Sequence, residues 1–558
     1  AKRRLSASCA TQSRAWPNGR VPEMAAVARP IRLIAGFITV GFWTLASRIL
    51  GFVRDILIAA YMGTGPVAEA FFIAFSLPNM FRRFFAEGAF NTAFVPMFSK
   101  KLEAGENPLG FARDAFSGLA SVLIVLTLVA QLVMPWLVLA VAGGFAGDVR
   151  LELAVDMGRV AFCYILFISL AALASGLLNA TGRFAAAAAA PILLNLILIA
   201  ALILAESGAV SGVTFGVETP TTASLTGLHH GTLLVWGTVL AGIAQLALVW
   251  VVAARLGFRL VPGWPRLTPD MRKLAMIMLP AMLAAGVVQV NLLVGRQVGS
   301  FFDGAIAWMS LADRLYQLPL GVVAIAIGIV LLPDLSRRLQ AGDTIGGRDA
   351  LSRAGEISLA LTVPAAVALC VIPTPLVSVL FERGAFTADD TAQTALALAA
   401  YGLGLPAFVL QKVLQPLYFA REDTRSPFRF ALVAMVVNAV VAIGLSFFIG
   451  FIGAAIATSV AGWAMVWLLL RGKRDMGEVA RFDDRYRQRL GRIVLAAFIM
   501  GLGLVIAATA LSPLLGTPGW RYLALLVLVL CGLALYGIAG QLLGAFRLSE
   551  FSSALRRR

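Results

Sequence analysis

Two stretches of the chain repeat one another: VPMFSKKLEAGE at residues 95–106 and LPDLSRRLQAGD at residues 332–343. A proline, a serine followed by two basic residues and a leucine, and an Ala-Gly pair recur at matching positions. This match favours an internal duplication. A second pair, LLNATGRF at 177–184 and LYFAREDT at 417–424, is weaker, and a chance likeness between basic loop starts stays open for it.

The residues around these repeats are strongly apolar. Of the 558 residues, 60% are hydrophobic and 13% are charged, and the mean hydropathy is +0.87. A soluble domain has about 25% charged residues. Too few polar residues are present to cover a soluble chain of this length, and apolar runs long enough to cross a bilayer recur throughout. The sequence therefore predicts an all-α polytopic membrane protein.

The apolar runs predict about fourteen transmembrane helices. Their expected ranges are 33–60, 68–98, 111–140, 151–178, 184–205, 231–256, 273–302, 304–334, 350–373, 388–420, 427–449, 451–471, 490–511 and 520–545.

The basic residues predict the orientation of these spans. Nearly all lysines and arginines outside the spans fall in the alternating segments that include the N-terminus, and the opposite segments contain only Arg150, Arg383 and Arg521. Because basic loops stay in the cytoplasm, both termini are expected there. The net charge of +17 fits this distribution and anionic lipids better than nucleic acid, which we do not expect as a partner.

The repeat unit contains six spans. Since six is even, the two copies share one orientation, and transporters built in this way place their cargo between two lobes near the midplane. The chain is expected to divide into a cytoplasmic N-terminal extension (1–32, with a natural start at Met24), an N-lobe (33–256), a linker (257–272), a C-lobe (273–471), a second linker (472–489), two further helices (490–545) and a basic cytoplasmic tail (546–558).

Charged residues within the spans mark the expected cargo site, because ionisable groups inside a bilayer are costly and usually line a cavity. Arginines outnumber acids in spans one, two, seven and eight. Arginine suits a pyrophosphate, since its planar fork donates paired hydrogen bonds and stays charged. Some acids are expected to neutralise arginines, with Arg83–Glu87 and Asp313–Arg314 as candidate pairs. The charged set is Arg48, Arg54, Asp55, Glu69, Arg82, Arg83, Glu87, Arg296, Asp313 and Arg314.

Several classes of site are not indicated. The chain has no P-loop, nucleophile elbow or HExxH motif, so we expect neither an ATPase nor a hydrolase, and the protein is predicted to be a transporter and not an enzyme. The four cysteines are scattered, and the only histidines, His229 and His230, lack a third ligand, so no metal site is expected.

Five motifs together resemble the MurJ (MviN) family of the multidrug/oligosaccharidyl-lipid/polysaccharide exporter superfamily. The resemblance runs from about residue 33 to the C-terminus, and its longest motif is in span two. The motifs are SRILGFVRD (47–55), AEAFFIAFSLPNMFRRFFAEGAFNTAFVPMF (68–98), ADRLYQLPLGV (312–322), FERGAFTADDT (381–391) and YFAREDTRSP (418–427).

The resemblance implies an inner-membrane flippase for lipid II, the undecaprenyl-pyrophosphate-linked peptidoglycan precursor, which it would move from the cytoplasmic to the periplasmic leaflet. It implies that the last two helices hold the lipid tail. Cell-wall synthases are candidate partners. The family's cavity arginines match Arg48, Arg54, Arg82 and Arg314, and its span-two acid matches Glu69. Arg296 matches no family position.

With no ATP site, the energy is expected from the membrane potential or from a cation gradient of Na⁺ or H⁺. Asn438 is a candidate cation ligand, although a helix-packing amide is the favoured interpretation. Three other functions stay open. A drug/cation antiporter would have an acidic cavity, a flippase for another polyprenyl-linked glycan would share the pyrophosphate site, and a membrane glycosyltransferase would need a catalytic acid such as Asp389 or Asp390.

Overall fold

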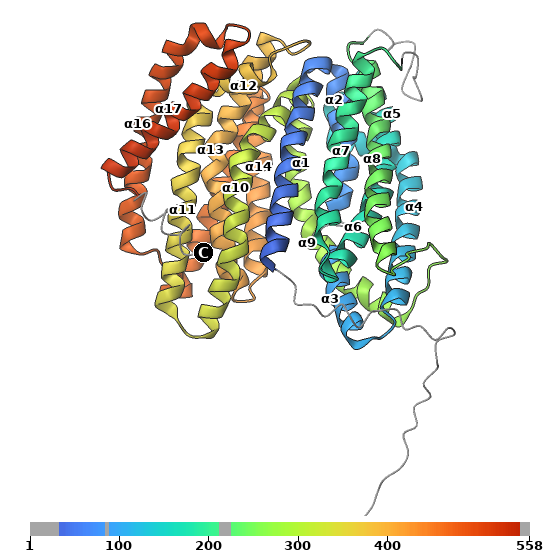
Figure 1. The fold of residues 1–558 in the computed structure, drawn as a ribbon. Coiled ribbons are helices and arrows are strands. Elements are labelled where there is room, and N and C mark those ends of the chain that lie inside the picture. Colours follow the sequence, from blue (N-terminus) through green and yellow to red (C-terminus); the bar gives the residue numbers. More distant parts are fainter. Residues whose placement is uncertain (1–32, 84–88, 211–224, 547–558) are drawn as a thin grey trace, which may run out of the picture.

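The computed structural model describes residues 33–83, 89–210 and 225–546, and these residues form helices joined by short turns, without a strand among them (Figure 1). The helices are α1 (Leu33–Met62), α2 (Pro66–Arg82), α3 (Ala89–Ala104), α4 (Pro108–Val141), η3 (Gly143–Phe145), α5 (Val149–Phe162), α6 (Tyr164–Ala180), α7 (Phe184–Glu206), α8 (Leu228–Arg255), α9 (Pro269–Gly299), α10 (Ala305–Gln340), α11 (Thr344–Val371), α12 (Pro373–Phe381), α13 (Ala388–Phe419), α14 (Arg425–Ile449), α15 (Ile452–Gly472), η4 (Lys473–Met476), η5 (Glu478–Ala480), α16 (Asp484–Leu515) and α17 (Trp520–Leu542).

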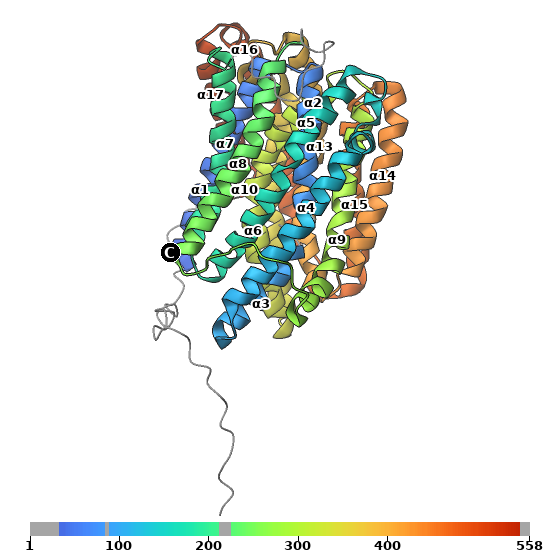
Figure 2. The ribbon, with the colours of Figure 1, turned by 90° about the vertical axis from the view of Figure 1, so that its right-hand side faces the viewer.

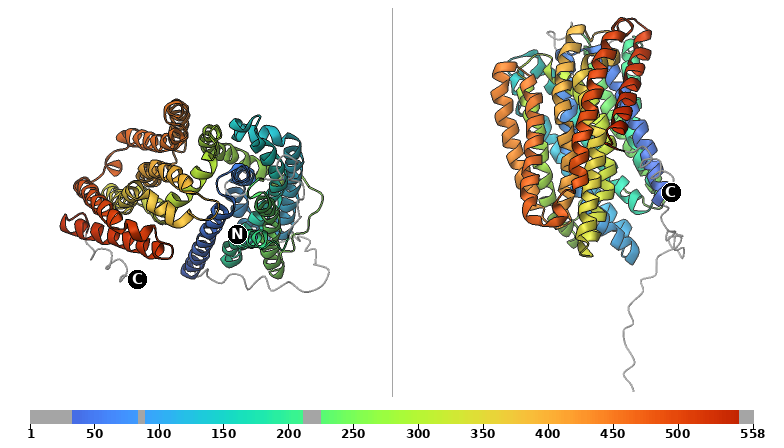
Figure 3. Two further views of the ribbon diagram at one scale, coloured as in Figure 1. Left: turned by 90° about the horizontal axis from the view of Figure 1, so that it is seen from above. Right: turned by 90° about the vertical axis from the view of Figure 1, so that its left-hand side faces the viewer.

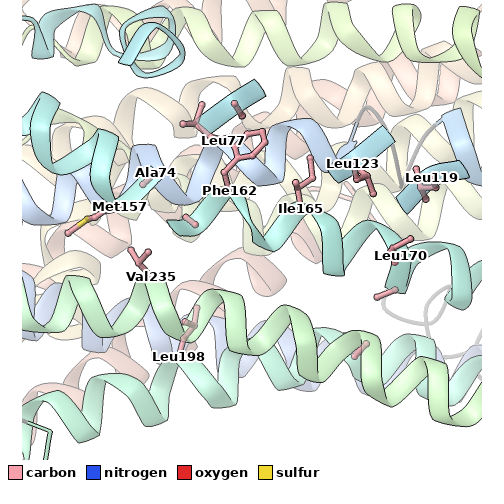
Figure 4. Close-up of a cluster of buried hydrophobic side chains, with 14 of the residues drawn as sticks. Ala74, Leu77, Leu119, Leu123, Met157, Phe162, Ile165, Leu170, Leu198 and Val235 are labelled. Carbon is pink, nitrogen blue, oxygen red and sulfur yellow. The ribbon is translucent and has the colours of Figure 1, made fainter. Parts of the chain in front are cut away.

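The helices form two lobes with an additional pair at one side. Helices α1–α8 make the N-lobe, α9–α15 make the C-lobe, and α16 and α17 pack against one another and against α11 and α12 (Figure 3). The N-lobe core is continuous from α2 to α8 and includes Leu77, Leu123, Phe162, Ile165 and Val235, all fully buried (Figure 4).

Polar caps fix where several helices begin. The Asn107 side chain accepts from the Gly110 amide at the start of α4, and Thr268 caps α9 in the same way. Thr387 and Asp390 form a reciprocal capping box at the start of α13. These side chains satisfy amides that the first helical turn leaves without intrahelical partners. The cap residues therefore set the register of long helices whose apolar sequences alone would not.

Ten helices of the described part are long and apolar enough to cross a membrane. The remaining expected spans correspond to α1, to α2 with α3, to α9 and to α10, so a count of fourteen is compatible with the structure. The expected single span 68–98 is covered by α2 and α3, between which residues 84–88 are not among the described residues, and span 151–178 is divided at Cys163 into α5 and α6. The short helix α12 had no counterpart in the sequence prediction.

The duplicated stretches fold alike. In the first copy the Glu106 amide donates to the Lys101 carbonyl at 3.0 Å, and in the second the Asp343 amide donates to the Arg338 carbonyl at 2.9 Å. Each turn contains a glycine with positive φ, at 68° and 71° respectively. A helix that ends in a left-handed glycine satisfies its last carbonyls in this way. Both copies thus close α3 and α10 with the same turn.

The two ends of the bundle differ. We call the end that carries the α1–α2 turn and α12 the upper end, as drawn in Figure 1, and the end that carries the α3–α4 and α10–α11 turns the lower end. The views in Figures 1 and 2 show that the long helices run between these two ends. The expected N-terminal extension 1–32 and nearly all of the tail 546–558 lie outside the described residues.

Candidate functional site

A cavity of about 640 Å³ lies between the two lobes. Its walls come from α1, α2, α6, α7 and α8 of the N-lobe and from α9 and α10 of the C-lobe. All six span arginines singled out from the sequence line it, together with two of the acids. These lining residues are Arg48, Arg54, Asp55, Arg82, Arg83, Arg296, Asp313 and Arg314.

The N-lobe wall is built around the neighbouring charges of α1. Arg54 donates to Asp55 Oδ1 through Nε at 3.0 Å and through Nη2 at 2.7 Å. Its Nη1 donates to Oδ1 of Asn195 on α7 at 3.0 Å, and the Asn195 amide nitrogen donates to the carbonyl of Ser47 at 2.9 Å. Arg54 is therefore held in place by one acid and one amide, and both of these partners are buried.

Asp55 also joins the two lobes. Its Oδ2 forms an ion pair with Nε of Arg314, on α10, at 2.7 Å. The direct ion pair of Arg314 is therefore with Asp55 of α1, while its expected partner Asp313 acts on it electrostatically without a direct pair. Arg48 extends across the same gap, and its guanidinium lies where a side chain on Gly321 of α10 would be. A glycine at this position leaves room for the arginine.

The C-lobe wall holds the remaining acid. Asp313 on α10 accepts a hydrogen bond from the Gln317 side chain one turn along the helix. Arg296 on α9 lies within electrostatic range of Asp313 and also of Arg83 on the opposing lobe. Among the described residues, no carboxylate forms an ion pair with Arg296. The cavity therefore contains more fixed cations than fixed anions.

Above the cavity, the lobes are tied together at the upper end. Asp390 of α13 accepts hydrogen bonds from Thr64 of the α1–α2 turn and from the Trp308 indole, the latter at 2.9 Å. The Ala385 amide donates to the Ala60 carbonyl at 2.7 Å. Asp390, one of the two candidate acids of a glycosyltransferase, is therefore engaged by these donors and by the α13 cap.

Glu69 belongs to this upper network and not to the cavity lining. One carboxylate oxygen accepts from the Ile306 amide of α10 at 3.0 Å, and the other accepts from Arg150 of α5 at 3.1 Å. Arg150 also pairs with Asp303 at 3.0 Å. Glu69 lies in the first turn of α2, three residues before Phe72, which does line the cavity, but its carboxylate is bound by Ile306 and Arg150 and is not part of the cavity lining.

We use the name upper seal for the contacts that join the two lobes at the upper end: Thr64 with Asp390, Ala60 with Ala385, and Glu69 with Ile306. Two further backbone amides, in η3, complete it. The amides of Gly143 and Gly144, in η3 of the N-lobe, donate to the side chains of Gln297 and Ser300 in the C-lobe at 3.0 and 2.9 Å. A Cβ on Gly144 would approach the Ser300 carbonyl carbon to 2.4 Å. Only a residue without a side chain lets the two lobes approach this closely.

Two of the predicted site residues remain, Asn438 and Glu87. Asn438 is buried on α14 and does not line the cavity. Glu87, with its expected partnership with Arg83, lies outside the described residues. Within the described ranges, no group of three His, Cys, Asp or Glu side chains is arranged to hold a metal ion.

Sequence reasoning missed two polar residues that organise the site, Asn195 and Arg150. Each carried a signal. Asn195 is the one amide in the apolar run of α7, and Arg150 is one of three basic residues in segments that otherwise lack them. In both cases the signal was a residue that departs from the pattern around it, a polar amide in an apolar helix and a basic residue in a segment expected to lack them.

Comparison with known proteins decides the family. The family described as "Lipid II flippase MurJ" matches residues 58–518. The "Probable lipid II flippase MurJ" of Rhizobium tropici is 41% identical over 533 residues, which cover 94% of this chain and 97% of the relative. The chain belongs to the MurJ family. The "Lipid II flippase MurJ" of Burkholderia cenocepacia is 34% identical, over 80% of this chain and 85% of its own.

Solved structures agree with the MurJ assignment. A structure titled "Lipid II flippase MurJ, inward closed conformation" aligns with a TM-score of 0.72 at 26% identity, over 90% of this chain and 98% of that chain. An inward-facing multidrug resistance MATE transporter of the MOP superfamily aligns with a TM-score of 0.60 at 13% identity, over 78% and 95%. The second likeness concerns the fold alone. The fold is thus that of the MurJ family, as the sequence predicts, and an arrangement of two six-span lobes with two extra C-terminal helices is compatible with it.

Proposed function

We propose that this protein is a lipid II flippase of the inner membrane, which moves the undecaprenyl-pyrophosphate-linked precursor from the cytoplasmic to the periplasmic leaflet for cell-wall synthesis. The observation that carries the proposal is the interlobe cavity of a MurJ family member, lined by six arginines and two aspartates. Fixed guanidinium groups in a low-dielectric site favour a pyrophosphate strongly over a neutral or cationic cargo.

Arg48, Arg54, Arg82 and Arg314 are the residues we assign to the pyrophosphate. Arg54 is already oriented by Asp55 and Asn195, so it loses little side-chain entropy on binding. Arg314 and Arg48 reach across the gap between α1 and α10, so a bound diphosphate would contact both lobes. Cargo contact with both lobes gives binding a direct means of changing their relative position.

The lower end is assigned to the cytoplasm. The predicted cytoplasmic loops, rich in lysine and arginine, lie at this end, and both termini are assigned to it. The basic residues at the upper end are engaged by the protein itself: Arg150 by Glu69, Arg383 by the Leu380 carbonyl at 2.7 Å, and Arg521 by the Glu382 carbonyl at 3.1 Å. Their exceptional placement thus has a local structural reason.

We propose alternating access because the two ends of the helix bundle differ, the upper end being the one where the lobes are joined. With the upper seal closed, cargo would enter from the cytoplasmic side, and rearrangement of the lobes would open the seal toward the periplasm. We assign the energy to the membrane potential or a cation gradient of Na⁺ or H⁺. The apolar helices α16 and α17 are assigned to the lipid tail, and cell-wall synthases are proposed consumers of the transported precursor.

The MATE-like fold raises drug export as a second candidate, but the charge of the cavity opposes it, because six arginines repel a cationic drug. A flippase for another polyprenyl-linked glycan shares the pyrophosphate chemistry and differs only in the sugar. The cargo itself must therefore be identified by experiment.

The decisive measurement is the leaflet location of lipid II in cells depleted of this protein, with an externally added lipid II-cleaving enzyme as the probe. We expect cleavable lipid II to disappear while total lipid II rises. Wild type and the control Arg159→Gln, an exposed α5 residue outside the cavity, should restore cleavage, and Arg48→Ala/Arg314→Ala should not. Unchanged cleavage on depletion would assign the protein another cargo.

A further inference from the structure

The cavity has more positive charge than a diphosphate can neutralise. Among its described lining residues, six arginines face two aspartates. A diphosphate diester carries one negative charge on each phosphorus, so part of the cationic surplus remains after it binds. Unneutralised cations in a low-dielectric site are costly, which favours a second anionic group on the same cargo. This argument rests on the proposed function, and it concerns the part of the cargo beyond the diphosphate.

Arg296 is placed to bind such a group. It lies on α9, which packs against α3 and α14, whereas the Arg54–Asn195 pair belongs to α1 and α7, which pack against each other. The two arginines therefore belong to different walls of one cavity. A group bound at Arg296 would be a different part of the cargo from the group bound at Arg54.

The surroundings of Arg296 leave it available. Its nearest acid in electrostatic terms, Asp313, already accepts from Gln317 and is also in range of Arg314. A guanidinium has five donors, and one shared carboxylate does not satisfy them. Arg83 approaches from the N-lobe and adds positive potential at the same place. Two cations from opposing lobes of the cavity thus add to the positive potential at the C-lobe wall.

We propose that Arg296, supported by Arg83, forms a second anion site in the cavity that binds a carboxylate of the cargo's peptide stem. A peptide with a free C-terminus always supplies at least one carboxylate, and arginine binds carboxylates through two parallel hydrogen bonds. The site gives the carrier a means of distinguishing a precursor with its complete peptide from a lipid diphosphate that lacks one.

The competing explanation is that Arg296 only neutralises Asp313. The two explanations differ in which cargo is affected. A neutralising role predicts that Arg296→Gln weakens the binding of every lipid diphosphate and that Asp313→Asn restores it. A carboxylate site predicts a loss confined to cargo that carries carboxylates, with no rescue by Asp313→Asn.

The test compares the affinities of the purified full-length protein for three probes: lipid II, lipid II whose stem carboxylates are converted to primary amides, and undecaprenyl diphosphate-linked disaccharide without peptide. We expect wild type to bind lipid II about tenfold more tightly than either other probe, as one charge-assisted contact predicts. In Arg296→Gln this preference should disappear while the affinity for the peptide-free probe stays the same. Arg83→Gln should reduce the preference partially.

The outcomes separate the inference from the function on which it rests. Equal weakening of all three probes by Arg296→Gln, or rescue by Asp313→Asn, would overturn the carboxylate site and leave the flippase proposal standing. A wild-type protein that binds none of the three would instead contradict the proposed function. Arg159→Gln, outside the cavity, is the matched control for loss of an arginine and should bind all three probes as wild type does.

Discussion

Asp55 is the acid that pairs with cavity arginines from both lobes. Its two oxygens contact Arg54 and Arg314 at 2.7 Å each, from two lobes, and the side chain is only 2% exposed. A carboxylate in this place occupies the guanidinium groups that the diphosphate is proposed to use. We therefore expect Asp55 to act as an internal substitute for the cargo, so that binding would exchange one anion for another.

Asp55→Asn tests this exchange. Removing one member of a buried ion pair costs about 3–5 kcal/mol, so the thermal midpoint of the empty protein should fall. With its competitor neutralised, a soluble diphosphate such as geranyl diphosphate should bind about tenfold more tightly and restore the midpoint. Thermal unfolding with and without the ligand measures both effects.

The control for this experiment is Asp156→Asn. Asp156 pairs with the half-exposed Arg159 on α5 and does not line the cavity, so its loss should change neither quantity appreciably. If Asp55→Asn bound geranyl diphosphate no better than wild type, Asp55 would be a structural acid and no competitor of the cargo.

At this scale the sequence predicted the charges well and their partners poorly. Arginines in apolar spans are unusual enough to be found without a structure, and all six line the cavity. Partners depend on which faces of distant helices meet. Arg314 therefore pairs with Asp55 instead of its neighbour Asp313, and Glu69 belongs to the upper seal.

Among the elements, the turns after α6 and α13 are informative because they are the second pair of repeats. The Arg183 amide donates to the Leu178 carbonyl at 2.8 Å, and the Asp423 amide donates to the Tyr418 carbonyl at 3.1 Å. The left-handed position is Gly182 in one copy, with φ of 74°, and Glu422 in the other, with φ of 62°. One copy thus carries a strained residue where the other has a glycine.

Glu422→Gly should stabilise the protein. A non-glycine residue in this conformation costs about 1–2 kcal/mol, part of which the greater flexibility of glycine in the unfolded chain cancels, so a gain of up to about 1 kcal/mol is expected. The opposite change, Gly182→Ala, should destabilise by a similar amount. Thermal unfolding of the two variants would measure the difference, and a lower midpoint for Glu422→Gly would show that its side chain makes a stabilising contact.

The elements themselves were largely predictable, because apolar runs bounded by basic loops define long helices. The breaks within the predicted spans were not predictable. Residues 149–180 together form one candidate membrane span, and nothing in the periodicity of its apolar residues marks the break at Cys163, where the amide bonds to the Val160 carbonyl in a tighter turn. The short α12, which begins at Pro373 just after α11, lies in the segment expected to be a loop between spans 350–373 and 388–420.

For the whole molecule, we expect the upper seal to set the balance between the two states of the proposed alternating-access cycle. Its hydrogen bonds join the lobes only while the upper end is closed. Thr64→Val, which keeps the shape of the side chain and removes its donor to Asp390, should cost the closed state about 1.4 kcal/mol, or a tenfold shift toward opening.

Amide hydrogen exchange of the α1–α2 turn and of residues 383–390 reports this shift, and both segments should exchange about tenfold faster in Thr64→Val. Thr391→Val is the matched control, because Thr391 donates to Glu382 within the C-lobe at 3.0 Å. It should leave exchange in the α1–α2 turn unchanged. Equal acceleration by both variants would mean that Thr64 contributes to local folding and not to lobe closure.

Sequence reasoning could reach two lobes, their common orientation and the cavity between them, since each follows from a repeat or from charge placement. It could not reach the seal. The seal joins segments such as Ala60 and Ala385 through backbone groups that leave no trace in residue type, and through polar side chains that also serve as ordinary helix caps.

The need for closure of the upper end can be tested genetically at Gly144. Its backbone conformation is open to any residue, and the C-lobe backbone at Ser300 is what excludes a side chain. The tolerance of this codon to substitution therefore reports whether the protein needs the closed state in order to function. In a mutational scan scored by cell survival, depletion of even alanine at Gly144 would mean that every productive cycle passes through full closure of the upper end.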